Sequence, residues 1–422
     1  MIAGAFASQN PDFPFPRAIE SDLQRAEKID RVNLMEDFID VDYTKYAGYV
    51  RQMTGKRIAI VPLQRMIQSQ LTLRNYKGAL DRVKQFEICF DKESHDEYEE
   101  LKKILATPVS GRRPAAILTA TYDIQNPSFN VAENRMYYTR VNGPSRRICY
   151  AVKDGVNWRP AGDAHFTNTD NDGLTLYGFY ADGKRMLLGS AGDIWIAEKE
   201  GDEWRVTDIP PYPVNSDYIE ADAYMLPDGS GLLFASDRPN GHNLQPSGAI
   251  FHGDTALASD LYFIPYTQNG WGVAVNLGKE VNTPYSERSP ILSRNLKTLY
   301  YVTDSRGLGY GDVYMVTRTS VEDWTHWSTP VNVGKETNSG FNESTVSFGQ
   351  DEKTLIITSN CNLGRYSAYT VPAIHNAANS YQSYSLDILG MEDFLFRVRV
   401  ADLTQQSVTQ IVEYVGEGHS VD

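Results

Sequence analysis

The spacing of hydrophobic residues changes once along this chain, near residue 108. Before that point apolar residues recur at helical spacing, as Ile19, Leu23, Ala26 and Ile29 do. The pattern predicts helices over 18–32, 58–73, 76–90 and 96–105. We therefore expect an N-terminal α-helical module over 16–107, closed by a linker at 108–114 that contains Pro, Gly and Arg.

After the linker, short apolar runs alternate with Asp-Gly and Asn-Gly turns, which is typical of β-strands. One apolar triplet recurs at intervals of 46 to 67 residues. Its copies lie at 136–138, 186–188, 232–234, 299–301 and 355–357. A second element with Asp, an apolar residue and an aromatic follows at 193–195, 260–262 and 312–314, and a Trp comes after it. Each unit thus supplies three or four strands, the size of a propeller blade.

A blade is stable only when it packs against neighbouring blades, because a single small sheet cannot bury both of its faces, whereas blades stacked around an axis can. The segments 275–282 and 331–338 are near copies and lie 56 residues apart. The predicted fold is therefore mainly β, a β-propeller over 115–422 behind the helical module. Six blades are favoured over five, since a hairpin over 393–401 and 407–415 could start a sixth. Residues 115–122 would then supply its missing strand and close the ring.

Particular motifs resemble a known family. They are the segments 235–238, 289–292, 299–306, 309–314 and 327–334, which carry Ser/Thr-Asp-x-Arg, Gly-x-Gly-Asp-x-Tyr and Trp-x-x-Pro-Val-Asn. These motifs resemble the WD40-like propeller repeats of the TolB type, and one helical hairpin resembles a tetratricopeptide unit. The combination is similar to exported cell-envelope proteins of Bacteroidota.

In that group the propeller often precedes an OmpA-like peptidoglycan-binding domain. This sequence departs from the pattern, since no such segment precedes Asp422. The resemblance implies a fold and an envelope setting, but one fold hosts many activities.

Composition excludes several function classes. The net charge of −14 argues against binding nucleic acid or anionic lipid through a basic surface. No run of 18 apolar residues occurs, so we expect no transmembrane segment. The cysteines Cys89, Cys149 and Cys361 form no CxxC pair, which argues against a zinc or iron–sulfur site.

The first residues are small and apolar, and Ala5-Phe6-Ala7 matches a signal-peptidase cleavage pattern. We interpret 1–15 as the remnant of a signal peptide followed by a flexible N-terminus. The protein is then exported and periplasmic or associated with the outer membrane. The alternative is a flexible N-terminus with no targeting role.

Three acids are the sharpest site candidates: Glu220, Glu287 and Glu343. Each precedes the first strand of a blade, and first strands line the axis of a propeller. The three carboxylates could therefore converge at one mouth of the channel, to bind a basic peptide or a divalent cation such as calcium. The structural alternative is a repeated capping contact to the backbone. No second ligand lies at close spacing, so no metal or cofactor is assigned.

An insertion at 239–258 brings His242, His252 and Asp254 between two strands. The spacing is a poor zinc signature, so we interpret the insertion as a partner-contact loop. The recurring Asp residues at 193, 237, 260, 304 and 312 are predicted to cap turns.

Together these features predict a non-catalytic scaffold that binds an envelope protein, peptide or glycan on a propeller face, in envelope biogenesis or secretion. The alternative function is a propeller-fold carbohydrate-active hydrolase or lyase that uses Glu220, Glu287 and Glu343 as its acids.

Overall fold

The computed structural model describes residues 43–91, 94–109, 114–243, 250–251, 254–255, 259–320, 322–362, 365–373, 396–402 and 407–414. The predicted helix over 18–32 and the signal-peptide remnant lie outside these residues. By its contacts the chain divides into two units, 1–381 and 382–422.

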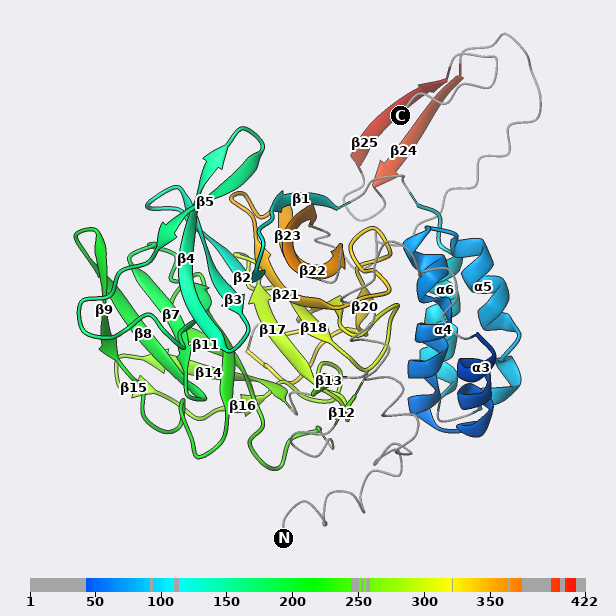
Figure 1. The fold of residues 1–422 in the computed structure, drawn as a ribbon, viewed down its shortest axis with the longest axis horizontal. Coiled ribbons are helices and arrows are strands. Elements are labelled where there is room, and N and C mark those ends of the chain that lie inside the picture. The colour runs from blue at the N-terminus through cyan, green and yellow to red at the C-terminus, as the bar shows by residue number, and fades with distance from the viewer. Residues whose placement is uncertain are drawn as a thin grey trace. The chain divides into compact units, whose positions relative to one another are not determined.

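The helical module follows the predicted pattern over most of its described length (Figure 1). Its elements are α3 (Tyr43–Gln52), η1 (Arg57–Ala59), α4 (Ile60–Thr72), α5 (Tyr76–Lys84), η2 (Glu87–Cys89) and α6 (His95–Ala106). The break between α4 and α5 falls at Arg74 and Asn75, where the Asn75 side chain accepts a hydrogen bond from the Gly78 amide and starts α5. Helix α3 was not predicted, since its buried stripe includes Tyr46 and Ala47 in place of large aliphatic residues.

The described strands of the first unit form a propeller of five blades, numbered here in chain order. The first blade contains β2 (Asp123–Asn130), β3 (Arg135–Asn142), β4 (Ser145–Asp154) and β5 (Asn157–Asp163), and the second contains β6 (Thr175–Phe179), β7 (Arg185–Ser190), β8 (Asp193–Glu200) and β9 (Glu203–Asp208). The third contains β10 (Glu220–Met225), β11 (Gly231–Ser236), β14 (Asp260–Thr267), β15 (Gly270–Trp271) and β16 (Val275–Asn276). The fourth contains β17 (Glu287–Leu292), β18 (Thr298–Thr303), β19 (Asp312–Thr317) and β20 (Val331–Asn332). Each predicted apolar triplet lies in the second strand of its blade.

The fifth blade closes the ring, and it corrects the predicted blade number from six to five. It contains β21 (Glu343–Phe348), β22 (Thr354–Asn362) and β23 (Arg365–Pro372), and its outer strand is β1 (Ala115–Leu118) from the other end of the propeller sequence. The predicted closing strand is thus found, one blade earlier than expected. The hairpin β24 (Phe396–Asp402) and β25 (Ser407–Tyr414) pairs only with itself among the described strands and belongs to the second unit.

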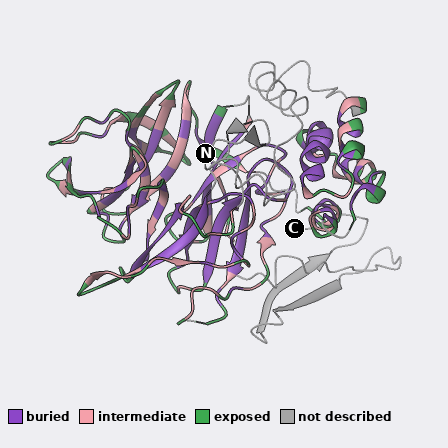
Figure 2. Cartoon of the chain, turned by 90° about the horizontal axis from the view of Figure 1, so that it is seen from below, coloured by how far each residue is buried: buried purple, intermediate pink, exposed green. Residues whose placement is uncertain are grey.

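The propeller core lies between adjacent blades, where the inner and middle strands are buried (Figure 2). One apolar cluster joins the two ends of the ring: Leu118 of β1 packs with Ile356 of the fifth blade and with Ile124 and Met136 of the first. The facing sides of neighbouring blades therefore pack together in one core, which makes a closed ring more stable than separate blades.

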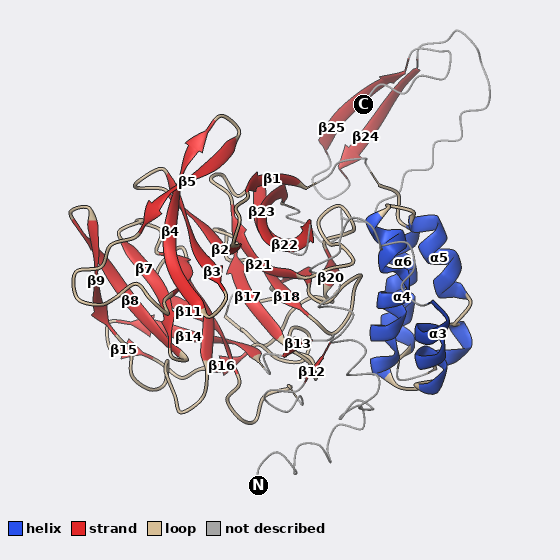
Figure 3. Cartoon of the chain, in the orientation of Figure 1, coloured by secondary structure: helices blue, strands red, loops and turns tan. Residues whose placement is uncertain are grey.

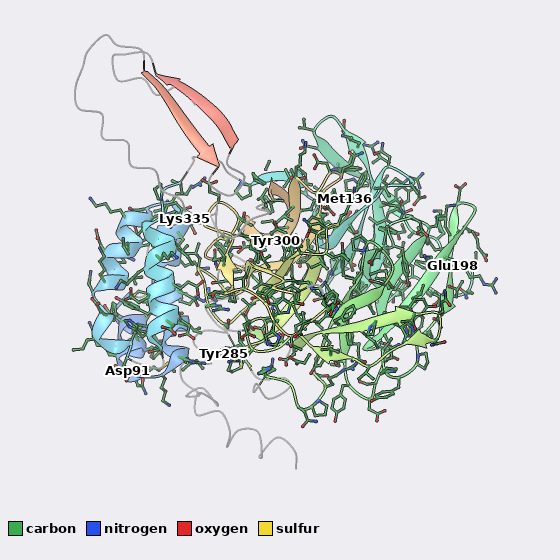
Figure 4. The ribbon with its side chains drawn as sticks, turned by 180° about the vertical axis from the view of Figure 1, so that it is seen from behind. Asp91, Met136, Glu198, Tyr285, Tyr300 and Lys335 are labelled. Atoms are coloured by element: carbon green, nitrogen blue, oxygen red, sulfur yellow. The ribbon has the colours of Figure 1, made fainter. Side chains whose placement is uncertain are left out.

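The helical module is packed directly on the propeller (Figure 3). The Gln64 side-chain amide donates to the Gly307 carbonyl at 2.9 Å, and Gln68 donates to the Gly340 carbonyl at 3.0 Å. Tyr285 belongs to the same buried cluster as the helices, and Lys335 donates to the Leu105 carbonyl at 2.7 Å (Figure 4). These contacts fix the module to the loops that precede the inner strands of the fourth and fifth blades, and to the loop between β18 and β19.

Within the described part of the chain, no helix has both the length and the apolar character needed to cross a membrane.

Candidate functional site

The junction glutamates, Glu220, Glu287 and Glu343, are the first residues of the inner strands β10, β17 and β21, and all three are fully buried. Each accepts two hydrogen bonds from the residue four positions earlier, one from its amide and one from its hydroxyl. The hydroxyl distances are 2.6 Å from Ser216 and 2.6 Å from Thr283. Ser339 donates to Glu343 in the same way at 2.7 Å. Each carboxylate therefore braces the loop that precedes its own strand.

A second hydroxyl reaches each junction glutamate from the neighbouring strand. The donors are Ser236 at 2.9 Å, Thr303 at 2.8 Å and Ser359 at 2.7 Å, each 16 residues after its glutamate. The carboxylates are thus tied on both sides within their own blades, in the manner of a repeated capping contact.

Glu220 has an additional partner in the Arg238 guanidinium, 2.9 Å from its Oε1. In the next blade Ser305 occupies the position of Arg238, and the arginine one residue further on, Arg306, lies 3.9 Å from Glu100 of helix α6. The arginine after the second strand therefore forms an ion pair inside its own blade in one case and contacts the helical module in the other.

Burial changes the protonation of these acids. Desolvation raises the pKa of Glu287 to about 8, and the nearby Asp260 carboxylate adds to the rise. Desolvation likewise raises the pKa of Glu343 to about 7. Both acids thus hold protons at pH values where a solvated glutamate has lost them.

The junction glutamates do not form a shared metal site in the structure. Among the described residues, no group of three His, Cys, Asp or Glu side chains could hold a metal ion.

A second repeated residue was missed by the sequence reasoning: a buried asparagine five positions before each junction glutamate. In the fourth blade, the Asn338 side chain accepts from the Val313 amide at 2.8 Å and donates to the Val313 carbonyl at 2.9 Å. Asn215 and Asn282 bridge Ile194 and Leu261 in the same way. The signal was present, because Asn282 and Asn338 end the two near-copied junctions.

We expect Asn338→Ala to lower the free energy of unfolding by about 2 kcal/mol, since it leaves the Val313 amide buried without a partner and removes one of two hydrogen bonds to the Val313 carbonyl, which keeps the bond from the Val333 amide. Urea unfolding followed by tryptophan fluorescence measures the change. Asn157→Ala, at an exposed strand position, is the matched control and should alter stability little. Equal stability of the two variants would show that the bridge contributes nothing.

Four of the recurring aspartates, Asp237, Asp260, Asp304 and Asp312, accept backbone hydrogen bonds at turns, as predicted. Asp304 accepts from the Ser286 amide at 2.8 Å, and Asp237 accepts from the Ile219 amide at 2.7 Å. Asp312 accepts from the amides of Leu308 and Gly309. These side chains hold the loops at the same end of the blades as the junction glutamates.

The residues of the insertion are described only in part. The His242 amide donates to Asp260, while its side chain is exposed, and the adjacent Asn243 donates to the Tyr285 carbonyl. Asp254 lies in the short strand β13 (Asp254–Thr255), which pairs with β12 (Ile250–Phe251). His252 lies outside the described residues. The start of the insertion is thus tied to a loop that the helical module covers.

The sequence also did not reveal an axial pocket of about 580 Å³. All five inner strands line it, with residues 126–129, 177–180, 222–225, 289–291 and 345–348. The turns that follow the inner strands complete its rim, and the junction glutamates are not among its lining residues. Because the inner strands begin at the glutamates and end at this rim, the pocket opens at the opposite end of the ring.

The inner strands bulge where they line this pocket, since the register of all five with their neighbours shifts there. Asn126, Asp222 and Ser289 take left-handed backbone conformations at these bulges, with φ of 49°, 50° and 52°. Such conformations are costly for residues other than glycine and concentrate at functional sites. The bulges turn backbone and short side chains toward the axis.

Asp222 is the acid of the axial pocket that lies on an inner strand, β10. Its Oδ2 accepts from the Ser289 amide at 3.1 Å, and burial raises its pKa despite the nearby Arg288. The other two acids of the lining are engaged at the rim, where Asp228 accepts from Ser230 and Glu352 lies 3.4 Å from Arg294. The pocket therefore combines one half-buried carboxyl with small hydroxyl residues and an aromatic wall that includes Phe129, Tyr177 and Phe348.

Comparison with known proteins gives likeness in fold only. No protein-family model and no curated protein matches the chain. Among solved structures, TolB from Acinetobacter baumannii is 14% identical, covering 61% of this chain and 56% of its own, with a TM-score of 0.35. An endo-1,4-β-xylanase from Bacteroides thetaiotaomicron is 12% identical over 60% of this chain and 92% of its own, with a TM-score of 0.39.

A gluconolactonase from Xanthomonas campestris is 13% identical over 64% of this chain and 91% of its own, with a TM-score of 0.39. The chain thus spans little more than half the length of the TolB structure that it matches.

Proposed function

We propose that this chain is a non-catalytic binding protein that takes a peptide segment of a partner protein into its axial pocket. The observation that carries the proposal is the pocket itself, to which every blade contributes. Its volume of about 580 Å³ falls within the usual range for ligand sites, and its lining mixes apolar walls with a few polar groups.

The chemistry of the lining suits a peptide. The hydroxyl of the half-buried Ser128 can exchange hydrogen bonds with a peptide backbone, while aromatic side chains take up apolar groups. Rigid strands hold these residues, so little conformational entropy is lost when a ligand binds. The acidic charge of the chain, −14, favours a partner segment with basic residues.

The alternative, a carbohydrate-active hydrolase or lyase that uses the junction glutamates, has less support. Glycoside hydrolysis needs two carboxyl groups that face one substrate. Glu220, Glu287 and Glu343 are buried, each is bonded within its own blade, and none lines the axial pocket. These features suit a structural role in the junction loops.

Ser128→Trp is the direct test of the pocket, because this half-buried serine lines it and a large ring there would fill it. The full chain, labelled with a fluorophore, is first screened on peptide and glycan arrays. We expect selective peptide binding that Ser128→Trp weakens at least about tenfold.

Val156→Trp is the matched control for this test, since Val156 is 87% exposed on the hairpin between β4 and β5, away from the pocket lining. Equal binding by Ser128→Trp and wild type would contradict the proposed site. Selective binding to glycans with turnover would favour the hydrolase.

We further propose that the protein is exported to the periplasm or outer membrane, in the setting that the N-terminal pattern and the resemblance imply. N-terminal sequencing of the protein from fractionated cells tests this. Cleavage after Ala7 in an envelope fraction is expected, and an intact Met1 in the cytosolic fraction would contradict it.

A further inference from the structure

Three junction loops of the propeller are built on one plan, and among the described residues two of them are covered by the helical module while the third is exposed. The repeated sequence is Asn-Ser/Thr-x-aromatic-x-Glu, at 215–220, 282–287 and 338–343. Its aromatic residues are Tyr218, Tyr285 and Phe341.

The backbone of the three loops is held by the same bonds. The amides of Tyr218, Tyr285 and Phe341 donate to the hydroxyl two residues earlier, at 3.3, 3.1 and 3.1 Å. The next amide in each loop donates to Asp237, Asp304 or Asn360. Because these bonds match, the three aromatic residues occupy equivalent positions at the same end of the ring.

Two of these aromatic positions are covered by the helical module. Tyr285 is 3% exposed and packs in the core cluster of the helices. Phe341 is also 3% exposed and lines a cavity together with Leu71 and Tyr76 of the helical module. Tyr218, by contrast, is 46% exposed, and so is its neighbour Ile219. Tyr212 of the same loop is 79% exposed.

The helix that lies over the equivalent loops shows which chemistry fits them. The segment 56–77, which contains α4, carries five basic residues and no acidic one. Its Arg65 lies over the ring of Tyr310 at 4.0 Å, and Gln68 donates to the backbone of the junction loop at Gly340. The uncovered loop has exposed acids at Asp208 and Asp217, which complement such a helix.

We propose that Tyr212, Tyr218 and Ile219 form a second interaction surface, which takes a basic, apolar helix of a partner protein. The loop is already braced by Glu220 and Asp237, so its apolar side chains are presented without a large entropic cost on binding. This surface lies at the opposite end of the inner strands from the axial pocket, so one chain could hold two partner segments at once.

The test uses a fluorescent synthetic peptide with the sequence of residues 56–77 as the probe and the full chain as receptor, followed by fluorescence anisotropy. We expect saturable binding that the double substitution Tyr218→Ser and Ile219→Ser weakens at least about tenfold. Val156→Ser, which removes a still more exposed apolar side chain elsewhere, should leave binding unchanged. A peptide with Arg57, Arg65 and Arg74 replaced by Glu should not bind.

Thermal unfolding of each variant confirms that the fold is retained, as expected for exposed positions. Absence of peptide binding, or binding that the double substitution leaves unchanged, would overturn the proposal. Light scattering adds a further check, since a dimer of wild type that the double substitution dissociates would assign this surface to a second copy of the chain.

Discussion

Leu118→Asp is expected to abolish stable folding of the propeller. Leu118 is 1% exposed and lies in β1, the strand that completes the fifth blade by pairing with β23. Its side chain packs between the first and fifth blades. An unpaired carboxylate there would cost about 4 kcal/mol or more, a large part of the stability of a typical domain. Circular dichroism and urea unfolding measure the loss.

Ala116→Asp is the matched control, because it places the same charge on the exposed side of the same strand. It should lower the free energy of unfolding by less than about 1 kcal/mol. If Leu118→Asp were as stable as Ala116→Asp, β1 would not close the ring.

Raising the pH from 5 to 9 is expected to destabilise the protein by several kcal/mol. Burial raises the pKa of Glu287 from 4.5 to about 8, that of Glu343 from 4.5 to about 7, and that of Asp304 from 3.8 to about 6. At a pH between the unfolded-state and folded-state pKa of each acid, the folded protein holds a proton that the unfolded chain has released. The resulting stabilisation is complete below the lower pKa and disappears as the pH rises through the upper one.

Thermal and urea unfolding at several pH values measure this dependence. The variant Glu287→Gln with Glu343→Gln should show a flatter profile, because glutamine cannot titrate but keeps an oxygen that accepts the hydroxyl bonds. Stability that rises from pH 5 to 9, or an unchanged slope in the double variant, would show that these carboxyls are ionised in the folded protein at acidic pH.

The blades were predictable because their middle strands are buried on both faces. Triplets such as Leu299-Tyr300-Tyr301 therefore appear as short apolar runs between turns, and all three of these residues are fully buried. The blade number was not predictable from the same evidence. The hairpin over 396–414 has the alternation of blade strands, but periodicity cannot show which strand a hairpin pairs with.

The candidate site was predictable only in part. Repetition identified Glu220, Glu287 and Glu343, but the hydroxyls that bond them from 16 residues away become visible only when neighbouring strands pair. The axial pocket left almost no signal, since residues such as Ser128, Gly178 and Pro290 line it at strand bulges. Small residues at a bulge resemble an ordinary turn in sequence, although here five strands bring them together.

Both proposals follow from a difference between the two ends of the ring. The junction loops at one end are braced by buried glutamates and hold the helical module, while the other end keeps an open pocket. The glutamates then matter for stability, and the pocket matters for binding.

Isothermal titration of the peptide selected on the array tests this difference most directly. The receptors are wild type, Ser128→Trp, and the triple variant Glu220→Gln, Glu287→Gln and Glu343→Gln, with mass spectrometry of the recovered peptide. We predict that the triple variant binds like wild type, that Ser128→Trp does not bind, and that the peptide is recovered unchanged. Loss of binding in the triple variant while Ser128→Trp still binds, or conversion of the ligand by wild type alone, would contradict the account.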